Sequence, residues 1–218
     1  MERPFFVHVD PHLVVVDKPA GLPSVPGRTP ELQDCAATRV QAVYEDALVV
    51  HRLDMATSGL LMFARGLQAQ RFLHRAFESR QVEKVYEAMV KGSLSPMKGS
   101  IDLPLIVDWP RRPRQIVDHD RGKPSLTHWE VLEPTRPPGP LEAQGLDCTR
   151  VQLRPVTGRS HQLRVHLAAL GHPMLGDDLY ADEHTRGRSD RLLLHATGLA
   201  VPHPQSQQTL RLHSTVPF

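Results

Sequence analysis

Residues 49 to 59 read VVHRLDMATSG, a stretch that passes from an apolar run through a charged centre to small polar residues. The two valines end the apolar segment 47–50, and the stretch runs into a second apolar segment, 59–64, with the sequence GLLMFA. Short apolar runs of this kind, bounded by polar residues and glycine, are typical of buried strands. We therefore expect two strands joined by an irregular stretch, 51–58, that brings Asp54 to the end of a buried strand beside Arg52.

A loop aspartate next to an arginine has several possible uses. Asp54 could be a nucleophile, a general base, a metal ligand or only a turn former, and turn formation is the ordinary role of a loop aspartate. It has no neighbouring carboxylate with which to form a two-acid site, which argues against glycoside hydrolysis by paired acids. It also argues against a magnesium site of the aspartyl-phosphate kind. A catalytic and a turn-forming Asp54 both stay open at this point.

Length and composition place the chain among soluble globular proteins. It has 218 residues, of which 40% are hydrophobic and 23% charged, values ordinary for that class. It has no apolar run near the roughly 20 residues that span a bilayer, and the start, MERPFFVHVD, lacks the pattern of a secretory signal. Cys35 and Cys148 fit neither a metal-ligand spacing nor a disulfide framework, so we expect reduced thiols and a cytoplasmic protein.

The remaining pattern predicts an α+β fold. We expect one domain containing a large mixed, mostly antiparallel β-sheet flanked by helices and loops. Apolar Leu67, Leu73, Ala76 and Phe77 predict a helix over 67–80. A proline- and glycine-rich segment, 134–145, predicts an exposed hairpin loop. The further expected strands are 12–17, 82–92, 126–131, 148–156, 191–201 and 207–216, and the further expected helices are 34–43 and 161–170.

Positive charge is carried mainly by arginine. Of 26 basic residues 21 are arginine and five are lysine; arginine suits phosphate and base recognition, although a bias in codon usage would give the same composition. Segment 108–123 combines an aromatic residue with clustered positive charge. Against these basic residues we count the acidic residues Asp118 and Asp120. This favours a phosphate-binding loop over a merely solvated one, and its residues are Trp109, Arg111, Arg112, Arg114, Arg121 and Lys123.

A second candidate anion site lies at the start of the helix expected over 161–170. Arg159 precedes this helix and Arg164 lies inside it, on the same face as Ser160. Backbone N–H groups at a helix start beside an arginine can bind an anion, whereas the alternative is a solvated helix face. His161, His166 and His172 have spacings of five and six residues, unlike the i, i+4 pairs of zinc-binding helices, so we expect structural histidines.

These stretches, taken together, resemble the RluA family of pseudouridine synthases. The likeness is carried, in the family's order, by KPAGLPSVPGR, HRLDMATSGLLMFA, KVYEAMVKG, GRSHQLRVHLAALGHPMLGDDLYA and RLLLHA. The resemblance covers most of the chain and implies the pseudouridine synthase fold over residues 1 to 218, without a separate N-terminal RNA-binding domain. It also implies an isomerase that detaches uracil from C1′ of a uridine and rejoins it through C5. Because this rearrangement is redox-neutral, we expect no cofactor and no metal.

The resemblance further implies a role for individual residues. Asp54 would be the essential catalytic carboxylate, and Arg164 would pair with it and keep it ionised. Tyr86 would stack on the target base, which agrees with the use of aromatic faces to hold extruded bases. Arg52 would fill the gap that the uridine leaves in the RNA stack. The RNA-binding set would be completed by His51, Arg159, Arg111, Arg112 and Arg114.

The expected partner is RNA, read as short stem-loops of 23S rRNA and of tRNA (the anticodon stem-loop), as in the dual-specificity members of this family. Two alternatives stay open: a synthase acting on only one of these RNA classes, and a non-catalytic RNA-binding protein. The carboxylate of Asp54 disfavours the second, because it would repel RNA phosphates. We expect a monomer, since no self-complementary apolar surface is evident.

Overall fold

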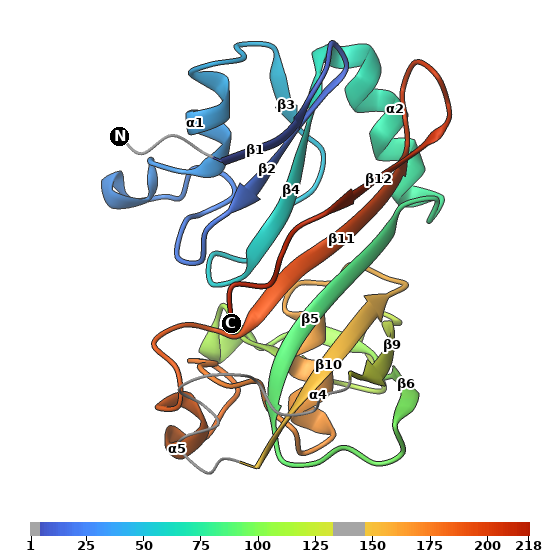
Figure 1. Cartoon of the computed structure of the whole chain (residues 1–218). Helices are drawn as coiled ribbons and strands as arrows, with labels where there is room; N and C mark the ends of the chain where they lie inside the picture. Colours follow the sequence, from blue (N-terminus) through green and yellow to red (C-terminus); the bar gives the residue numbers. More distant parts are fainter. Residues whose placement is uncertain (1–4, 133–146) are drawn as a thin grey trace. The chain divides into compact units, whose positions relative to one another are not determined.

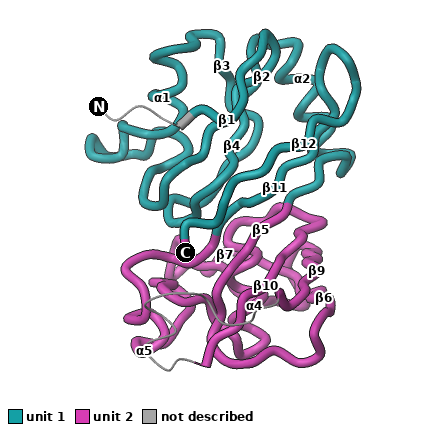
Figure 2. Tube along the Cα trace, in the orientation of Figure 1, with its two compact units in different colours: residues 1–84, 195–217 teal, residues 85–194, 218 magenta. Residues whose placement is uncertain are grey.

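The computed structural model describes residues 5–132 and 147–218 of the chain (Figure 1). It contains two compact units, coloured separately in Figure 2. Unit 1 combines residues 1–84 with residues 195–217, and unit 2 consists of residues 85–194 and 218. The predicted hairpin loop 134–145 lies outside the described residues. The single-domain organisation stays a prediction.

Unit 1 is built on a sheet in which strands follow the order β1-β2-β4-β11, with β3 also paired to β4 and β12 to β11. All of these pairs are antiparallel except β4 and β11, which run parallel with His195 opposite Ser58. The elements of this unit are β1 (Phe5–Val9), β2 (Leu13–Lys18), α1 (Ala36–Gln41), β3 (Ala47–Val49), β4 (Ser58–Arg65), α2 (Gly66–Glu78), β11 (Leu194–Pro202) and β12 (Thr209–His213).

Unit 2 contains an antiparallel run of strands in the order β5-β10-β9-β6 and a separate hairpin of β7 and β8. The strand-rich, mostly antiparallel architecture predicted from the sequence is confirmed by these pairings. The elements are β5 (Glu83–Lys91), β6 (Lys98–Asp102), β7 (Leu105–Val107), β8 (Gln115–Val117), β9 (Leu126–Val131), β10 (Cys148–Pro155), α4 (Gln162–Ala169) and α5 (Glu183–Arg186).

The core of unit 1 forms where α2 packs on the sheet. Ala69, Leu73 and Ala76, at spacings of four and three, are the buried face of α2, and Phe77 is partly buried beside them. The prediction was wrong for Leu67, which is 61% exposed, because six residues from Leu73 is about 240° around a helix. The helix packs against alternate residues of β2 and β4, which are Leu13, Val15, Leu60, Met62 and Ala64.

Helix α4 of unit 2 ends at a glycine in the left-handed conformation. Gly171 has a φ of +85°; its N–H binds the carbonyl of Ala168, and the N–H of His172 binds that of Leu167. This pair of bonds is a Schellman motif, which requires a left-handed residue and so favours glycine. The sequence places Leu163, Leu167 and Leu170 at i, i+4 and i+7, the spacing of one apolar helix face. Leu170 is instead 42% exposed, because it is the capping residue beyond the last helical turn.

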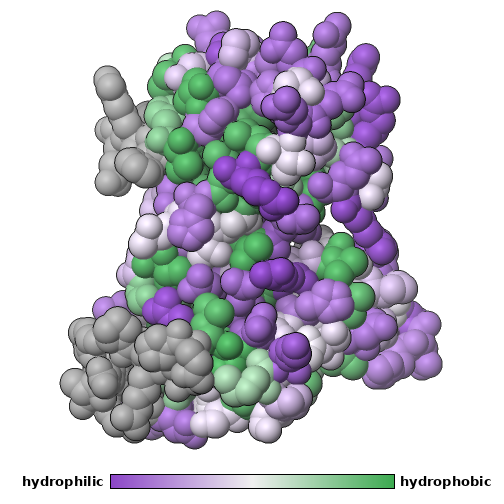
Figure 3. All heavy atoms as spheres, turned by 45° about the vertical axis from the view of Figure 1, so that its right-hand side comes forward, coloured by the Kyte–Doolittle hydropathy of each residue, from purple (hydrophilic) through white to green (hydrophobic). Residues whose placement is uncertain are grey.

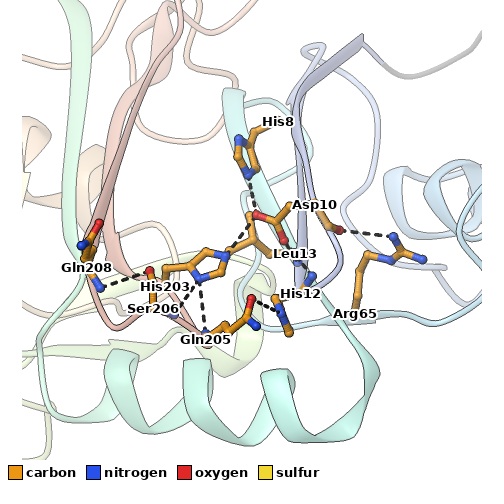
Figure 4. Close-up of polar contacts among 9 residues, drawn as sticks. All are labelled: His8, Asp10, His12, Leu13, Arg65, His203, Gln205, Ser206 and Gln208. Carbon is orange, nitrogen blue, oxygen red and sulfur yellow. Dashed lines mark hydrogen bonds and ion pairs between the residues drawn. The ribbon is translucent and has the colours of Figure 1, made fainter.

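A polar cluster in unit 1 joins the turn after β1 to the turn after β11 (Figure 4). Asp10 Oδ2 lies 2.6 Å from His8 Nε2 and 3.2 Å from His203 Nε2, while its Oδ1 accepts the backbone N–H groups of His12 and Leu13. Burial alone would raise the pKa of Asp10, but these hydrogen bonds outweigh it and lower the pKa to about 2. The carboxylate thereby fixes the two turns to each other.

Several bulk predictions can be compared with the structure. Cys35 and Cys148 are buried free thiols. Among the helices that the structure describes, none has the length and apolar composition that crossing a membrane requires. Figure 3 shows hydrophilic and hydrophobic residues interspersed over the face in view. Among the residues that the structure describes, the large hydrophobic side chains that are exposed are far apart in the sequence; they are Val9, Val43, Met55, Leu67, Met97, Trp109 and Leu170.

Candidate active site

Asp54 lies in the connection between β3 and β4, as the sequence predicts. Its neighbour Leu53 is 7% exposed, and Asp54 is partly exposed between this buried residue and Met55, which is 50% exposed. The N–H of Thr57 donates to the carbonyl of Asp54 over 3.1 Å and closes a turn before β4 begins at Ser58. The chain therefore enters the turn at a buried residue, Leu53, and the turn itself is partly exposed to solvent.

The residues on both sides of Asp54, Leu53 and Met55, are held through their backbone groups by side chains from segment 18–24. Ser24 Oγ accepts the N–H of Leu53 at 3.0 Å and donates to the Leu53 carbonyl at 2.7 Å. The ammonium of Lys18, only 1% exposed, donates to the carbonyl of Met55 at 3.1 Å and also to those of Pro19 and Leu22. We call Lys18 and Ser24 the loop clamps, and they fix the position from which the Asp54 side chain projects.

His51 turns into unit 1. Its Nε2 accepts the backbone N–H of Met62 at 3.0 Å, and its ring stacks on Phe77 with centroids 5.0 Å apart. Burial, and to a smaller degree the charge of Lys84, lower the pKa of His51 to about 3. The neutral ring is the form that can accept a hydrogen bond from an N–H group. This histidine joins the Asp54 connection to β4, while the adjacent Arg52 is exposed.

Arg164 is buried in unit 2, so the solvated-face alternative for this residue is wrong. Its Nε and Nη2 donate to the two oxygens of Asp177 at 2.8 and 2.6 Å, and Nη2 also reaches Asp178 at 2.8 Å. Arg164 is 3% exposed and Asp177 0%. This bidentate pair fixes the guanidinium, and Tyr180 lies over it at 5.2 Å. The pairing of Arg164 with Asp54 stays a prediction.

The segment before α4 is held by a buried glutamine. Gln162 Oε1 accepts from the hydroxyl of Thr157 at 2.7 Å and from the N–H of Arg159 at 3.0 Å. Its amide nitrogen donates to the carbonyl of Leu126 and to Thr127 Oγ1 on β9. Arg159 itself is exposed. Gln162 thus connects the arginine-bearing turn to the sheet of unit 2.

The three histidines near this helix have internal hydrogen-bond partners. His161 Nδ1 lies 2.7 Å from the hydroxyl of Tyr180, and His172 Nδ1 lies 2.8 Å from the carbonyl of Lys91. His166 bonds through both ring nitrogens, at 2.9 Å to a threonine hydroxyl and at 3.0 Å to a backbone carbonyl. Within residues 5–132 and 147–218, no three His, Cys, Asp or Glu side chains are grouped so that they could hold a metal ion.

The basic segment 108–123 is divided between paired and stacked arginines. Arg111 forms an ion pair with Asp108 at 2.7 Å, and Arg121 forms one with Asp118 at 2.9 Å; Asp108 was missing from the charge count made on the sequence. By contrast, the guanidinium of Arg112 lies over the ring of Trp109 at 4.5 Å, and Trp109 is 64% exposed. Arg114 lies over Tyr180 at 5.5 Å.

The predicted site residues fall into both units. Tyr86 is partly buried on β5, in register with Leu153 of β10. Sequence reasoning missed the loop clamps and Asp177, although KPAGLPS and LGDD lie inside the motifs it quoted. Unit 1 holds His51, Arg52 and Asp54, and unit 2 holds Tyr86, Arg111, Arg112, Arg114, Arg159 and Arg164.

The fold and these motifs define an enzyme of RNA modification. The family described as RNA pseudouridylate synthase matches residues 12–169, and the chain belongs to this family. It is therefore a pseudouridine synthase, an isomerase, as the sequence predicts. It is 48% identical over 212 residues to the dual-specificity RNA pseudouridine synthase RluA of Pasteurella multocida (strain Pm70), covering 97% of this chain and 93% of that protein. With the protein of the same name from Escherichia coli (strain K12) it shares 47% identity over 220 residues, covering 100% and 96%.

Solved structures agree with the fold. The structure titled human RNA pseudouridylate synthase domain containing 1 superposes with a TM-score of 0.81 and 29% identity, covering 100% of this chain and 85% of that one. Human RNA pseudouridylate synthase domain containing 4 gives a TM-score of 0.77 and 26% identity, covering 98% and 88%. The predicted pseudouridine synthase fold is confirmed.

Proposed function

We propose that this chain is a dual-specificity RNA pseudouridine synthase that acts on uridines in stem-loops of 23S rRNA and in the anticodon stem-loop of tRNA. The observation that carries the proposal is identity of 47–48% with proteins named for dual specificity, extending over 97–100% of this chain. A match of this extent includes the loops, and loops that flank the site determine which RNA shape is accepted.

Asp54 is the catalytic carboxylate in this proposal. The isomerisation breaks the bond from C1′ to N1 of uracil, forms a bond from C1′ to C5, releases the C5 hydrogen as a proton, and leaves N1 to take up a proton. The loop clamps support the assignment, because a reacting group must be held to within fractions of an ångström and the clamps bind the backbone of both neighbouring residues, Leu53 and Met55. The reaction is redox-neutral and requires neither a cofactor nor a metal.

The other site residues prepare and hold the uridine. Tyr86 stacks on the extruded base, and Arg164 keeps Asp54 ionised, since an opposite charge favours the carboxylate. Arg52, exposed two residues before Asp54, fills the gap in the RNA stack and offsets an unstacking penalty of about a few kcal/mol. His51 stays in the proposed RNA-binding set, although its ring is engaged with β4.

Phosphate binding is assigned to Arg111, Arg112, Arg114 and Arg159. Stacking of Arg112 on Trp109 supports a role in RNA binding, because an exposed aromatic with an arginine can hold both a base and a phosphate. Arg111 is already paired with Asp108 and would contribute less. The protein is proposed to act as a cytoplasmic monomer, in line with the scattering of its exposed hydrophobic residues.

Release of the C5 hydrogen provides the experiment. Wild-type protein and Asp54→Asn are incubated with a tRNA anticodon stem-loop and with a 23S rRNA stem-loop, each carrying uridine tritiated at C5, and tritium release is followed. We expect wild-type turnover on both RNAs and none with Asp54→Asn, while the control Asp46→Asn, which changes an exposed aspartate paired with Arg65, stays active. Turnover on one RNA alone would remove dual specificity. Binding without turnover by the wild type would leave an RNA-binding protein.

A further inference from the structure

A buried histidine in unit 1 connects the end of the Asp54 turn to a carboxylate on β2. His195 is 1% exposed. Its Nδ1 lies 2.7 Å from Ser58 Oγ, and its Nε2 lies 2.8 Å from Ser214 Oγ. The hydroxyl of Ser214 in turn donates to Asp17 Oδ2. We call these four residues the relay; they come from the distant segments β2, β4, β11 and the residues after β12.

With the His195 ring neutral, the relay has a single consistent direction. An ionised carboxylate can only accept hydrogen bonds, so Ser214 donates to Asp17 and its oxygen is left to accept from Nε2–H of His195. Nδ1 of the neutral ring then accepts from the hydroxyl of Ser58. This assigns one tautomer to His195 and one orientation to each hydroxyl. A series of hydrogen bonds in which every donor and acceptor is paired holds its side chains in one arrangement.

The first member of the relay is the residue at which the Asp54 turn joins the sheet. Ser58 is 2% exposed and begins β4 directly after Thr57, whose N–H closes the turn onto Asp54. At this point β4 and β11 approach closely: Gly59 has a φ of +112°, and a Cβ there would lie 2.4 Å from the carbonyl oxygen of Ala196. The contact of His195 with Ser58 therefore acts on a backbone segment, the end of the Asp54 turn, that is packed too closely against β11 to shift independently.

The relay and one of the loop clamps begin at adjacent residues of β2, Asp17 and Lys18. Lys18 binds the carbonyl of Met55, inside the turn, while Asp17 reaches Ser58, at the end of the turn, through Ser214 and His195. The end of β2 thus holds the turn directly at Met55 and holds its exit through the relay. The Asp54 turn is held in a closed frame that includes residues more than a hundred positions away in the chain.

We propose that His195 is a positioning residue for the isomerisation, acting through Ser58 on the turn that carries Asp54. The inference rests on the proposed role of Asp54 as the catalytic carboxylate. His195 is buried and does not touch RNA in this scheme, so its loss should slow the chemical step and leave RNA affinity unchanged. A displacement of about 1 Å at a reacting group can lower a rate by about 100-fold.

The test compares two substitutions that each keep one half of the relay. Asn places an amide where Nδ1 was and can still accept from Ser58, whereas Gln extends toward Ser214 and loses Ser58. We expect His195→Asn to retain a single-turnover rate within roughly 10-fold of wild type and His195→Gln to fall by about 10- to 100-fold. The dissociation constant for the RNA stem-loop should change by less than about 3-fold in both.

Two further variants keep the test decisive. Ser214→Ala removes the link to Asp17 with little loss of volume, and we expect a smaller decrease in rate, about 3- to 10-fold, if the frame positions Asp54. Val201→Ala on the same strand, at a residue 0% exposed, is the control for loss of stability without loss of the relay. The proposal is overturned if His195→Asn and His195→Gln have equal rates, or if both match Val201→Ala. Activity of Asp54→Asn would instead overturn the proposed function itself.

Discussion

Replacing Lys18 by Met tests whether a buried cation holds the Asp54 turn. The ammonium donates to the carbonyls of Pro19, Leu22 and Met55 at 2.9, 2.7 and 3.1 Å and is 1% exposed. Methionine fills a similar volume but donates no hydrogen bond. All three carbonyls lose the ammonium as a donor, but that of Met55 keeps the N–H of Gly21 at 2.8 Å.

Each buried acceptor that loses its donor costs about 1–3 kcal/mol, and removing a buried charge offsets part of the sum. We therefore expect Lys18→Met to lower the free energy of unfolding by about 3 kcal/mol. For a chain of this length that corresponds to a decrease in Tm of roughly 6–12 °C. Because Lys18 cannot reach RNA from its buried position, the rate of isomerisation should fall at least about 10-fold with RNA affinity unchanged.

Urea unfolding followed by circular dichroism measures the first effect, and single-turnover tritium release measures the second. Lys91→Met is the matched control, because Lys91 is half-exposed and paired with Asp182 at the surface, where an ion pair contributes about 0–1 kcal/mol. The reasoning is refuted if the two variants unfold within about 0.5 kcal/mol of each other.

Three further predictions follow from charged residues. Asp10→Asn should reduce the free energy of unfolding at neutral pH. Because the pKa of Asp10 is lowered to about 2, its contribution to stability is lost only as the pH falls toward that value. The difference from wild type should therefore disappear when acid unfolding is measured from about pH 4 down to pH 2. Asp177→Asn should lower the free energy of unfolding by roughly 3–5 kcal/mol, because it leaves the buried guanidinium of Arg164 without its charged partner. Asp178→Asn, at a side chain 63% exposed, should have little effect. Equal effects of the two variants in urea unfolding would contradict this prediction. Arg112→Gln should weaken RNA binding and reduce the slope of log K against log salt by roughly 0.7–0.9, and Arg121→Gln, whose arginine is paired with Asp118, should change the slope less in the same fluorescence anisotropy titration.

Local sequence patterns were sufficient for the strands around Asp54. The apolar runs 47–50 and 59–64 correspond to β3 (Ala47–Val49) and β4 (Ser58–Arg65), and the irregular stretch between them is the Asp54 connection. The error on α2 was also visible locally, because Leu67 and Leu73 are six residues apart and do not share a helix face. Periodicity thus located the elements and, applied strictly, would have oriented them.

Contacts between distant segments could not be found in this way. Nothing in the sequence near Arg164 shows that Asp177, thirteen residues later, completes its buried pair. His195 reads as one more residue of an apolar strand until the parallel pairing with β4 brings Ser58 to it. Hydrogen bonds of this kind depend on strand register, which is determined by the packing of the whole sheet rather than by the residues nearby.

The discontinuity of unit 1 has a consequence for how the enzyme is made. Residues 85–194 are inserted between the strand that follows Asp54 and the strand that carries His195. A ribosome adds about 5–20 residues each second, so roughly 7 to 27 seconds separate synthesis of residue 84 from synthesis of residue 217. During that interval the Asp54 turn has its clamps but not its relay. The turn that carries the proposed catalytic carboxylate is therefore held by the relay only after residues 195–214 have been synthesised.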